Sequence, residues 1–154
     1  MRRNLVILMV IVAAALGITA AASVAHAHHS HPYTYDWCRT VAIEGRVESV
    51  QWKDPHTLVL VKVDDGAVYT VDWMSLGGLT NNRLIAQAQA ALVPGARIAV
   101  TAAPIRSLAQ IREKFPDYNY EVNPRTLDPR SIRVGDSFNW ALTPDPNPPD
   151  CRGK

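Results

Sequence analysis

Histidines are concentrated near the N-terminus, in a spacing that suits metal coordination. Four of the five histidines fall within residues 26–31, and they are His26, His28, His29 and His31. Imidazole nitrogen is a good ligand for copper, zinc and nickel. The pattern predicts a copper or zinc site built from His28, His29 and His31, with the fifth histidine, His56, as a further ligand.

Two processing registers would give such a metal different geometries. Cleavage after Ala27 makes His28 the first residue, so its α-amino group and ring could chelate one ion together with other histidines. Cleavage after Ala25 puts His28 in third place, where Cu(II) can bind in a square plane through the amine, two backbone nitrogens and the ring. The alternative is a polar histidine-rich segment that adsorbs metals weakly.

A second group of reactive side chains falls within residues 51–56, between two strand-like runs. Trp52, Asp54 and His56 meet there at a proline bend. With Trp73 they predict an edge that binds a protein, a peptide or a small ligand. The simpler interpretation is that His56 bonds a backbone carbonyl or Asp54, and that both tryptophans belong to a core.

Motifs of common enzyme classes are absent from the sequence. It has no glycine-rich phosphate loop, His-Glu-x-x-His, Gly-x-Ser-x-Gly, Cys-x-x-Cys or haem attachment sequence. Asp54 and His56 could form half of an acid–base pair, but no motif marks Ser75 or Ser107 as the nucleophile. The sequence therefore predicts a non-catalytic protein.

Residues 1–27 have the features of a secretory signal peptide. Arg2 and Arg3 precede an apolar run over residues 5–22, and Ala25-His26-Ala27 fits the small-x-small cleavage pattern. An uncleaved anchor is the alternative, because the run is nearly long enough to span a bilayer. We predict cleavage, a periplasmic location and no stable membrane span afterwards.

Without the signal peptide the chain is formally neutral. The whole sequence has 16 Lys and Arg against 14 Asp and Glu, and Arg2 and Arg3 account for the excess. Domains that bind nucleic acid usually present a positive surface. The composition therefore argues against nucleic acid as a partner.

The two cysteines, Cys38 and Cys151, lie near opposite ends of the exported chain. An even number of cysteines in an oxidising compartment favours a disulfide, although free or metal-binding thiols are the alternative. A disulfide would tie an N-terminal arm, residues 28–40, to a proline-rich tail, residues 143–154.

Between arm and tail, the pattern is mainly that of β-strands. Side chains suited to strands, many of them alternating between apolar and polar, predict strands at residues 41–50, 57–63, 68–74, 97–103 and from 131 onward. Gly45 in the first strand suggests a bulge or a sharp coil. Thr80 can cap a helix over residues 81–92. Residues 105–128 are irregular and are predicted to be an inserted loop.

This order of elements predicts a mainly β fold. Three strands, a helix and two strands match a small five-stranded OB-like barrel over residues 41–142, although the order also permits another small β-roll. The binding edge of an OB barrel usually involves strands two and three and the loop between strands one and two. Residues 51–56 would form that loop.

Several segments together resemble a known family. They are Ala27-His28-His29-Ser30, Ile43-Glu44-Gly45-Arg46-Val47, residues 51–56 and residues 92–98. They resemble small exported bacterial proteins of unknown function with an OB-like barrel, in which Asn is commoner at position 54 and Phe at position 31. The two cysteines and residues 105–128 depart from that pattern. The resemblance implies the barrel and export, and it implies no activity.

Overall fold

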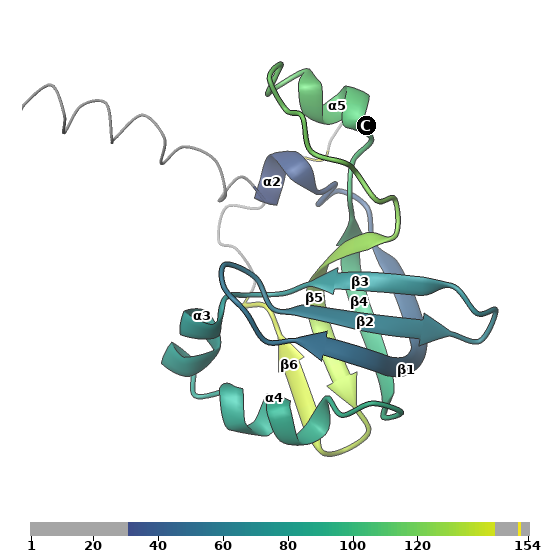
Figure 1. Ribbon diagram of the computed structural model, residues 1–154, viewed down its shortest axis with the longest axis vertical. Coiled ribbons are helices and arrows are strands. Elements are labelled where there is room, and N and C mark those ends of the chain that lie inside the picture. The colour runs from purple at the N-terminus through teal and green to yellow at the C-terminus, as the bar shows by residue number, and fades with distance from the viewer. Residues whose placement is uncertain (1–30, 144–150, 152–154) are drawn as a thin grey trace, which may run out of the picture. The chain divides into compact units, whose positions relative to one another are not determined.

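The structure, a computed structural model, describes residues 31–143 and Cys151 (Figure 1). Contacts divide the chain into Met1–Ser30 and His31–Lys154, and all described residues belong to the second unit. The predicted signal peptide and His26, His28 and His29 lie outside the described residues. Within the described part, no helix is long and apolar enough to cross a membrane.

A closed five-stranded β-barrel confirms the predicted fold class. Its strands are β1 (Val41–Gln51), β2 (Leu58–Val63), β3 (Val68–Asp72), β4 (Arg97–Pro104) and β5 (Thr126–Val134). Antiparallel pairs link β3 to β2, β2 to β1, β1 to β4 and β4 to β5. A parallel pair of β3 with β5 closes the barrel, with Val71 opposite Leu127. A sixth strand, β6 (Phe138–Ala141), extends the sheet from β5.

The alternation in the sequence builds the core because successive strand side chains point to opposite faces. In β1, Ile43 and Val47 are buried while Glu44 and Glu48 are exposed. Burying one such aliphatic side chain stabilises the fold by about 1.5–3 kcal/mol. Other core residues include Val59, Val61, Val71, Val100, Leu127 and Ile132.

Gly45 does not itself form the bulge that was one of its two predicted roles. The register shift of β1 against β2 lies between Val47 and Ser49, so the bulge is displaced from the glycine. A Cβ atom at Gly45 would lie 2.4 Å from the carbonyl oxygen of Lys62. Glycine is therefore required here for close approach of the neighbouring strand.

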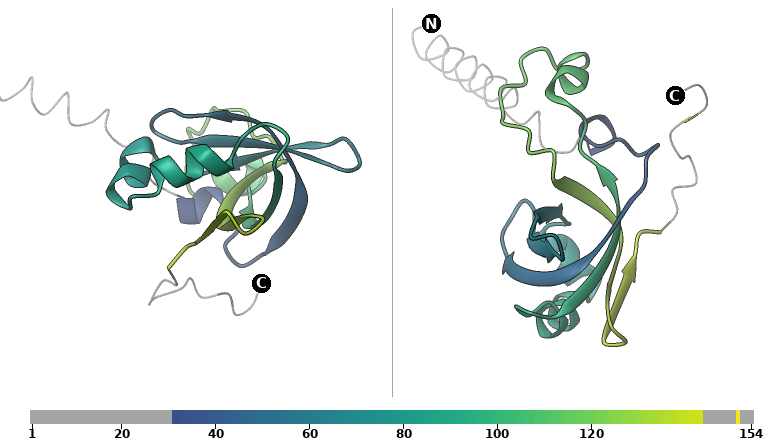
Figure 2. Two further views of the ribbon diagram at one scale, coloured as in Figure 1. Left: turned by 90° about the horizontal axis from the view of Figure 1, so that it is seen from below. Right: turned by 90° about the vertical axis from the view of Figure 1, so that its right-hand side faces the viewer.

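Two short helices lie between β3 and β4, where one helix over residues 81–92 was predicted; the second corresponds to it and the first was missed. They are α3 (Leu76–Asn81) and α4 (Ile85–Ala91). The N-cap of α3 is Ser75, whose Oγ accepts from the Gly78 amide at 3.0 Å, and Thr80 lies inside the helix. Arg83, with φ of 57°, lies between the helices in the left-handed region, which interrupts helical geometry. Figure 2 shows α4 across one end of the barrel, with α2 (His31–Thr34) beyond the other end.

The predicted loop at residues 105–128 is partly ordered into regular elements. It contains α5 (Leu108–Arg112), and its last three residues already belong to β5, which begins at Thr126. The expected start at Ser131 was wrong because Pro129 interrupts the strand pattern. The β4–β5 register is irregular at this proline, as expected where a residue lacks the ladder donor.

Candidate functional site

The N-terminal arm folds back along the C-terminal end of β4. After α2, Tyr35 forms an isolated antiparallel bridge with Ile105. The Asp36 amide donates to the Pro104 carbonyl at 2.8 Å, and the Arg106 amide donates to the Thr34 carbonyl at 2.9 Å. These backbone hydrogen bonds fix the position of the arm at one end of the barrel.

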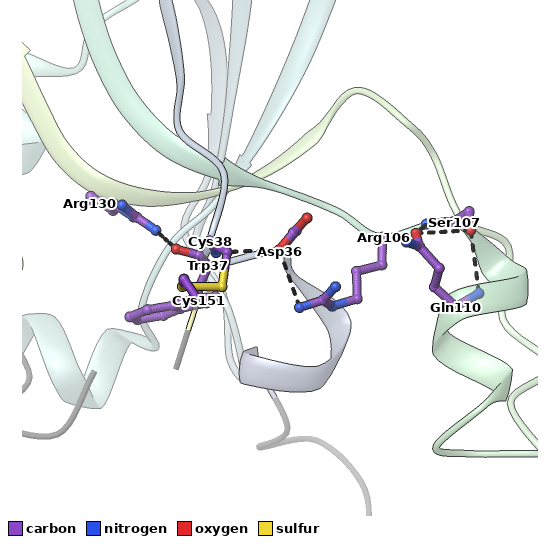
Figure 3. Close-up of polar contacts among 8 residues, drawn as sticks. All are labelled: Asp36, Trp37, Cys38, Arg106, Ser107, Gln110, Arg130 and Cys151. Carbon is purple, nitrogen blue, oxygen red and sulfur yellow. Dashed lines mark hydrogen bonds and ion pairs between the residues drawn. A yellow bond between two sulfur atoms is a disulfide. The ribbon is translucent and has the colours of Figure 1, made fainter. Parts of the chain in front are cut away.

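Side-chain contacts hold the second half of the arm (Figure 3). Cys38 and Cys151 form the predicted disulfide, with 5.4 Å between their Cα atoms. Arg130 of β5 donates to the Trp37 carbonyl and, at 3.0 Å, to Thr40 Oγ1. Its guanidinium carbon also lies 5.8 Å from the centre of the Trp37 ring, within cation–π range.

An ion pair fastens the arm to the segment after β4. Arg106 Nη2 lies 3.3 Å from Asp36 Oδ1, and both side chains are mostly buried. Asp36 Oδ1 also accepts from the Cys38 amide at 3.3 Å. The arm is thus attached through its backbone, a disulfide and charged side chains.

Tyr35, Asp72 and His56 form a continuous series of polar contacts, which we call the polar chain. The Tyr35 hydroxyl donates to Asp72 Oδ2 at 2.6 Å. The other oxygen, Asp72 Oδ1, lies 2.7 Å from His56 Nδ1. Tyr35 is buried, whereas the side chains of His56 and Asp72 are 22% and 18% exposed. The polar chain therefore connects the buried face of the arm with the loop between β1 and β2.

Pairing of β2 with β3 brings His56 to Asp72. Leu58 lies opposite Asp72 at the end of the β2–β3 ladder. The Thr57 amide donates to the Met74 carbonyl at 3.1 Å, and the Trp73 amide donates to the Thr57 carbonyl at 2.9 Å. Thr57, the last residue of the loop, is thereby held beside Trp73 and Met74, which directly follow Asp72.

Asp128 adds a second carboxylate near Tyr35. It is 7% exposed and follows Leu127, the residue of β5 that pairs with Val71 of β3. The pKa of Tyr35 is raised well above its usual range, and burial is the largest cause. The charge of Asp72, the hydrogen bond to Asp72 and the charge of Asp128 raise this pKa further, in that order. The phenol therefore remains a protonated donor at physiological pH.

The raised pKa of Tyr35 predicts a pH-dependent contribution to stability. An unfolded tyrosine ionises at about pH 10. The contribution of the buried, protonated Tyr35 to the unfolding free energy is therefore complete below that pH and decreases above it. We expect the difference in unfolding free energy between wild type and Tyr35→Phe to be smaller at pH 11 than at pH 8. Urea unfolding at both pH values measures it, and an unchanged difference would contradict the assignment.

The structure brings together only some of the residues of the predicted binding edge, which are Trp52, Asp54, His56 and Trp73. Asp54 is exposed, and its Oδ1 accepts from the Leu76 amide at 3.1 Å, so it ties the loop to α3. Trp52 is half-buried against the core. Trp73 does not reach the edge, because it is 2% exposed and packs edge-to-face on Phe138. His56 pairs with Asp72 instead of the expected Asp54.

Sequence reasoning missed Tyr35, Asp72 and Asp128. Asp72 carried a weak signal, since aspartate is depleted in strands and this one follows an apolar run. Tyr35 and Asp128 carried none, because their positions depend on contacts across the fold.

The predicted metal ligands are divided between described and undescribed parts of the chain. His56 is in the polar chain, and the backbone of His31 begins α2. His28 and His29 lie outside the described residues. Residues 31–143 and 151 contain no group of three His, Cys, Asp or Glu that could hold a metal. Since Cys38 and Cys151 are bonded to each other, they do not act as thiol ligands.

Comparison with known protein families gives a match. The model of a family described as "Family of unknown function (DUF6152)" matches residues 15–111. This span includes Tyr35, His56 and Asp72, and it ends before Asp128 and Cys151. A search of curated proteins finds no match.

Proposed function

This chain belongs to the family of unknown function DUF6152, and we propose that it is an exported, non-catalytic module that binds a protein, peptide or small ligand. The proposed binding surface is the loop between β1 and β2, residues 52–57. Because the function of the family is unknown, the proposal rests on the geometry of this loop.

One observation carries the proposal: the loop is exposed yet braced on two sides. Lys53, Asp54 and Pro55 are exposed. Asp54 is bonded to the α3 backbone at 3.1 Å, and His56 is held by Asp72 at 2.7 Å. A loop fixed in this way loses little conformational entropy when a ligand binds, which favours affinity.

The position of the loop in the barrel supports the same function. Ligands of OB barrels usually contact the loop between strands one and two and the surface of strands two and three. Here His56 precedes β2 and Asp72 ends β3. The polar chain therefore lies at the edge where such a barrel binds its ligands.

Side-chain roles support binding without catalysis. Ser75 Oγ accepts from the Gly78 amide, and Ser107 Oγ accepts from the Gln110 amide, so both serines act as helix N-caps. The cysteines are joined in a disulfide. Ser75, Ser107 and the two cysteines thus have structural roles.

The disulfide also supports export. Disulfides persist in oxidising compartments such as the periplasm and are rare in the cytosol. The bridge between Cys38 and Cys151 joins the arm to the tail, as expected for an exported domain with a predicted signal peptide.

Photo-crosslinking in living cells tests the proposed surface. A photoreactive amino acid at Lys53 should give one or a few discrete products, because this side chain is exposed on the loop. The matched control is Asp64, also exposed, in the turn at the other end of β2 and β3. Mass spectrometry of the exported protein after irradiation identifies the product.

The two positions separate specific binding from random labelling. Products at Lys53 and none at Asp64 support the loop as the binding surface. Equal labelling at both positions, or labelling only at Asp64, would show that the loop is not the binding surface.

A further inference from the structure

Four aromatic residues lie on α2 and on the turn after α5, two helices at the same end of the barrel (Figure 1). Tyr33 packs edge-to-face on Phe115, with 5.8 Å between ring centres, and Tyr118 packs on Tyr120 at 5.4 Å. The Tyr118 amide donates to the Phe115 carbonyl at 3.0 Å, so one turn connects the two pairs. We call these four residues the aromatic surface, which joins the arm to the loop between β4 and β5.

Much of the aromatic surface is open to solvent. Tyr33 is 52% exposed and Tyr120 is 58% exposed. The other strongly exposed large hydrophobic side chains in the described part, Val93 and Leu142, are aliphatic and lie on other segments. In an edge-to-face pair each ring covers only part of its partner, which leaves ring surface for a ligand. Exposed apolar side chains that cluster in this way mark a binding surface.

The segment that carries the aromatic surface is held in a fixed conformation. Ser107 and Gln110 form a capping box at the start of α5 (Figure 3), and Ile111 of this helix is buried. Arg112 Nε donates to the Tyr118 carbonyl at 2.9 Å and closes the following turn. Rings that are fixed before binding lose little conformational entropy when a ligand docks.

Polar side chains alternate with the aromatic ones along this segment. Asp117, Asn119 and Glu121 flank Tyr118 and Tyr120 in the sequence, and all three are exposed. A carboxylate or an amide makes two or more hydrogen bonds, which suits neighbouring hydroxyl groups. A sugar ring presents hydroxyl groups around its rim and C–H groups on its faces, which are attracted to the negative face of an aromatic ring. The pattern therefore fits a saccharide.

The charge of this segment favours an uncharged ligand. Residues 107–125 contain equal numbers of basic and acidic side chains, which are Arg112, Lys114 and Arg125 against Glu113, Asp117 and Glu121. Single-stranded nucleic acids also stack on aromatic rings, but their binding sites combine these rings with a positively charged groove. The balanced charge therefore favours a neutral polymer over a polyanion.

We propose that the aromatic surface binds a neutral oligosaccharide, whose sugar rings stack on Tyr33 and Tyr120. The loop between strands four and five contributes to the binding surface of OB barrels, and oligosaccharides are among their ligands. Here that loop, residues 105–125 between β4 and β5, carries three of the four aromatic residues. This surface is additional to the one proposed at residues 52–57 and does not depend on it.

Titration with defined oligosaccharides tests the proposal. Maltotetraose, cellotetraose and chitotetraose are added separately to the full exported protein, and binding is followed by NMR. We expect at least one tetramer to bind and to shift the ring resonances of Tyr33 and Tyr120. We also expect the tetramer to bind more tightly than the corresponding disaccharide, because it can cover both rings.

Substitutions of Tyr120 separate ring stacking from general hydrophobic contact. Tyr120→Ala should weaken binding about tenfold, as expected for the loss of one stacking ring. Tyr120→Phe keeps the ring and should bind nearly as well as wild type, whereas Tyr120→Leu should bind as weakly as Tyr120→Ala. The matched control is Val93→Ala, which removes a side chain 48% exposed just after α4 and should leave binding unchanged. Circular dichroism confirms that each variant is folded.

Three results would overturn the proposal. They are absence of binding to all three tetramers, unchanged affinity in Tyr120→Ala, and an equal loss in Val93→Ala. Binding of decaproline without binding of any tetramer would identify a surface for proline-rich peptides instead. Specific crosslinking at Lys53 without tetramer binding would refute only the saccharide site, and tetramer binding without that crosslinking would refute only the loop.

Discussion

Replacing both cysteines, by Cys38→Ser with Cys151→Ser, is expected to lower the free energy of unfolding by about 4 kcal/mol. The cysteines are 113 residues apart in the sequence, so the disulfide closes a very long loop of the unfolded chain. The chain-entropy model assigns about 4.7 kcal/mol to a loop of about 100 residues, and residual compactness of the unfolded chain reduces that value. Urea unfolding followed by circular dichroism measures the change.

The double variant should also loosen the arm before it unfolds the barrel. The Asp36 amide, bonded to the Pro104 carbonyl at 2.8 Å, reports on attachment of the arm. Its hydrogen exchange should accelerate more than that of the Val59 amide in β2. Reduced wild-type protein is the control, since it lacks the bridge but keeps both side chains. Equal stability of oxidised and reduced protein would contradict the prediction.

Gly45→Ala is expected to destabilise the barrel by about 3 kcal/mol, at the upper end of the range for overpacking a well-packed site. The added methyl group would lie 2.4 Å from the Lys62 carbonyl oxygen and 2.9 Å from its carbon. These atoms belong to the backbone of β2, so they cannot turn away as a side chain would. Relief requires β1 and β2 to separate where Gly45 pairs with Val63. Thermal and urea unfolding measure the loss.

Gly77→Ala is the matched control for this substitution. Gly77 lies in α3, and the nearest atom to an added Cβ, Ser75 Oγ, is 3.8 Å away. Alanine favours a helix over glycine by about 1 kcal/mol, so the control should keep or slightly raise stability. A similar loss in both variants would show that steric contact with Lys62 is not the cause.

The sequence determined the fold class because strand alternation is a local property. The order of apolar and polar residues within β1 and within β3 indicates which face of each strand is buried, whichever strands they pair with. The disulfide could also be predicted from the sequence, since two cysteines in a chain predicted to be exported allow one intramolecular pairing. Arg2, Arg3 and the following apolar run predict export by the same kind of local pattern.

The first and last residues of several helices and strands could not be predicted, because they depend on contacts between segments that are distant in the sequence. The helix predicted over residues 81–92 begins only at Ile85, as α4, because Arg83 interrupts the helical path, and α3, which Ser75 caps, was not predicted. β5 begins at Thr126 because Thr126 and Leu127 pair with β3 to close the barrel. Such pairing joins segments more than 50 residues apart, and a proline inside β5 obscured the remaining signal.

Only the tertiary structure decided the composition of the site. The loop at residues 51–56 was identified from residue types, yet His56 pairs with Asp72 because the β2–β3 register places them together. Tyr35 reaches the same carboxylate from 37 residues away, after the arm has folded back. Trp73 turned inward because its position in the pleat continues the buried face of Val71. The sequence thus identifies the candidate side chains, while the pairing of distant strands and the folded arm decides which of these side chains contact one another.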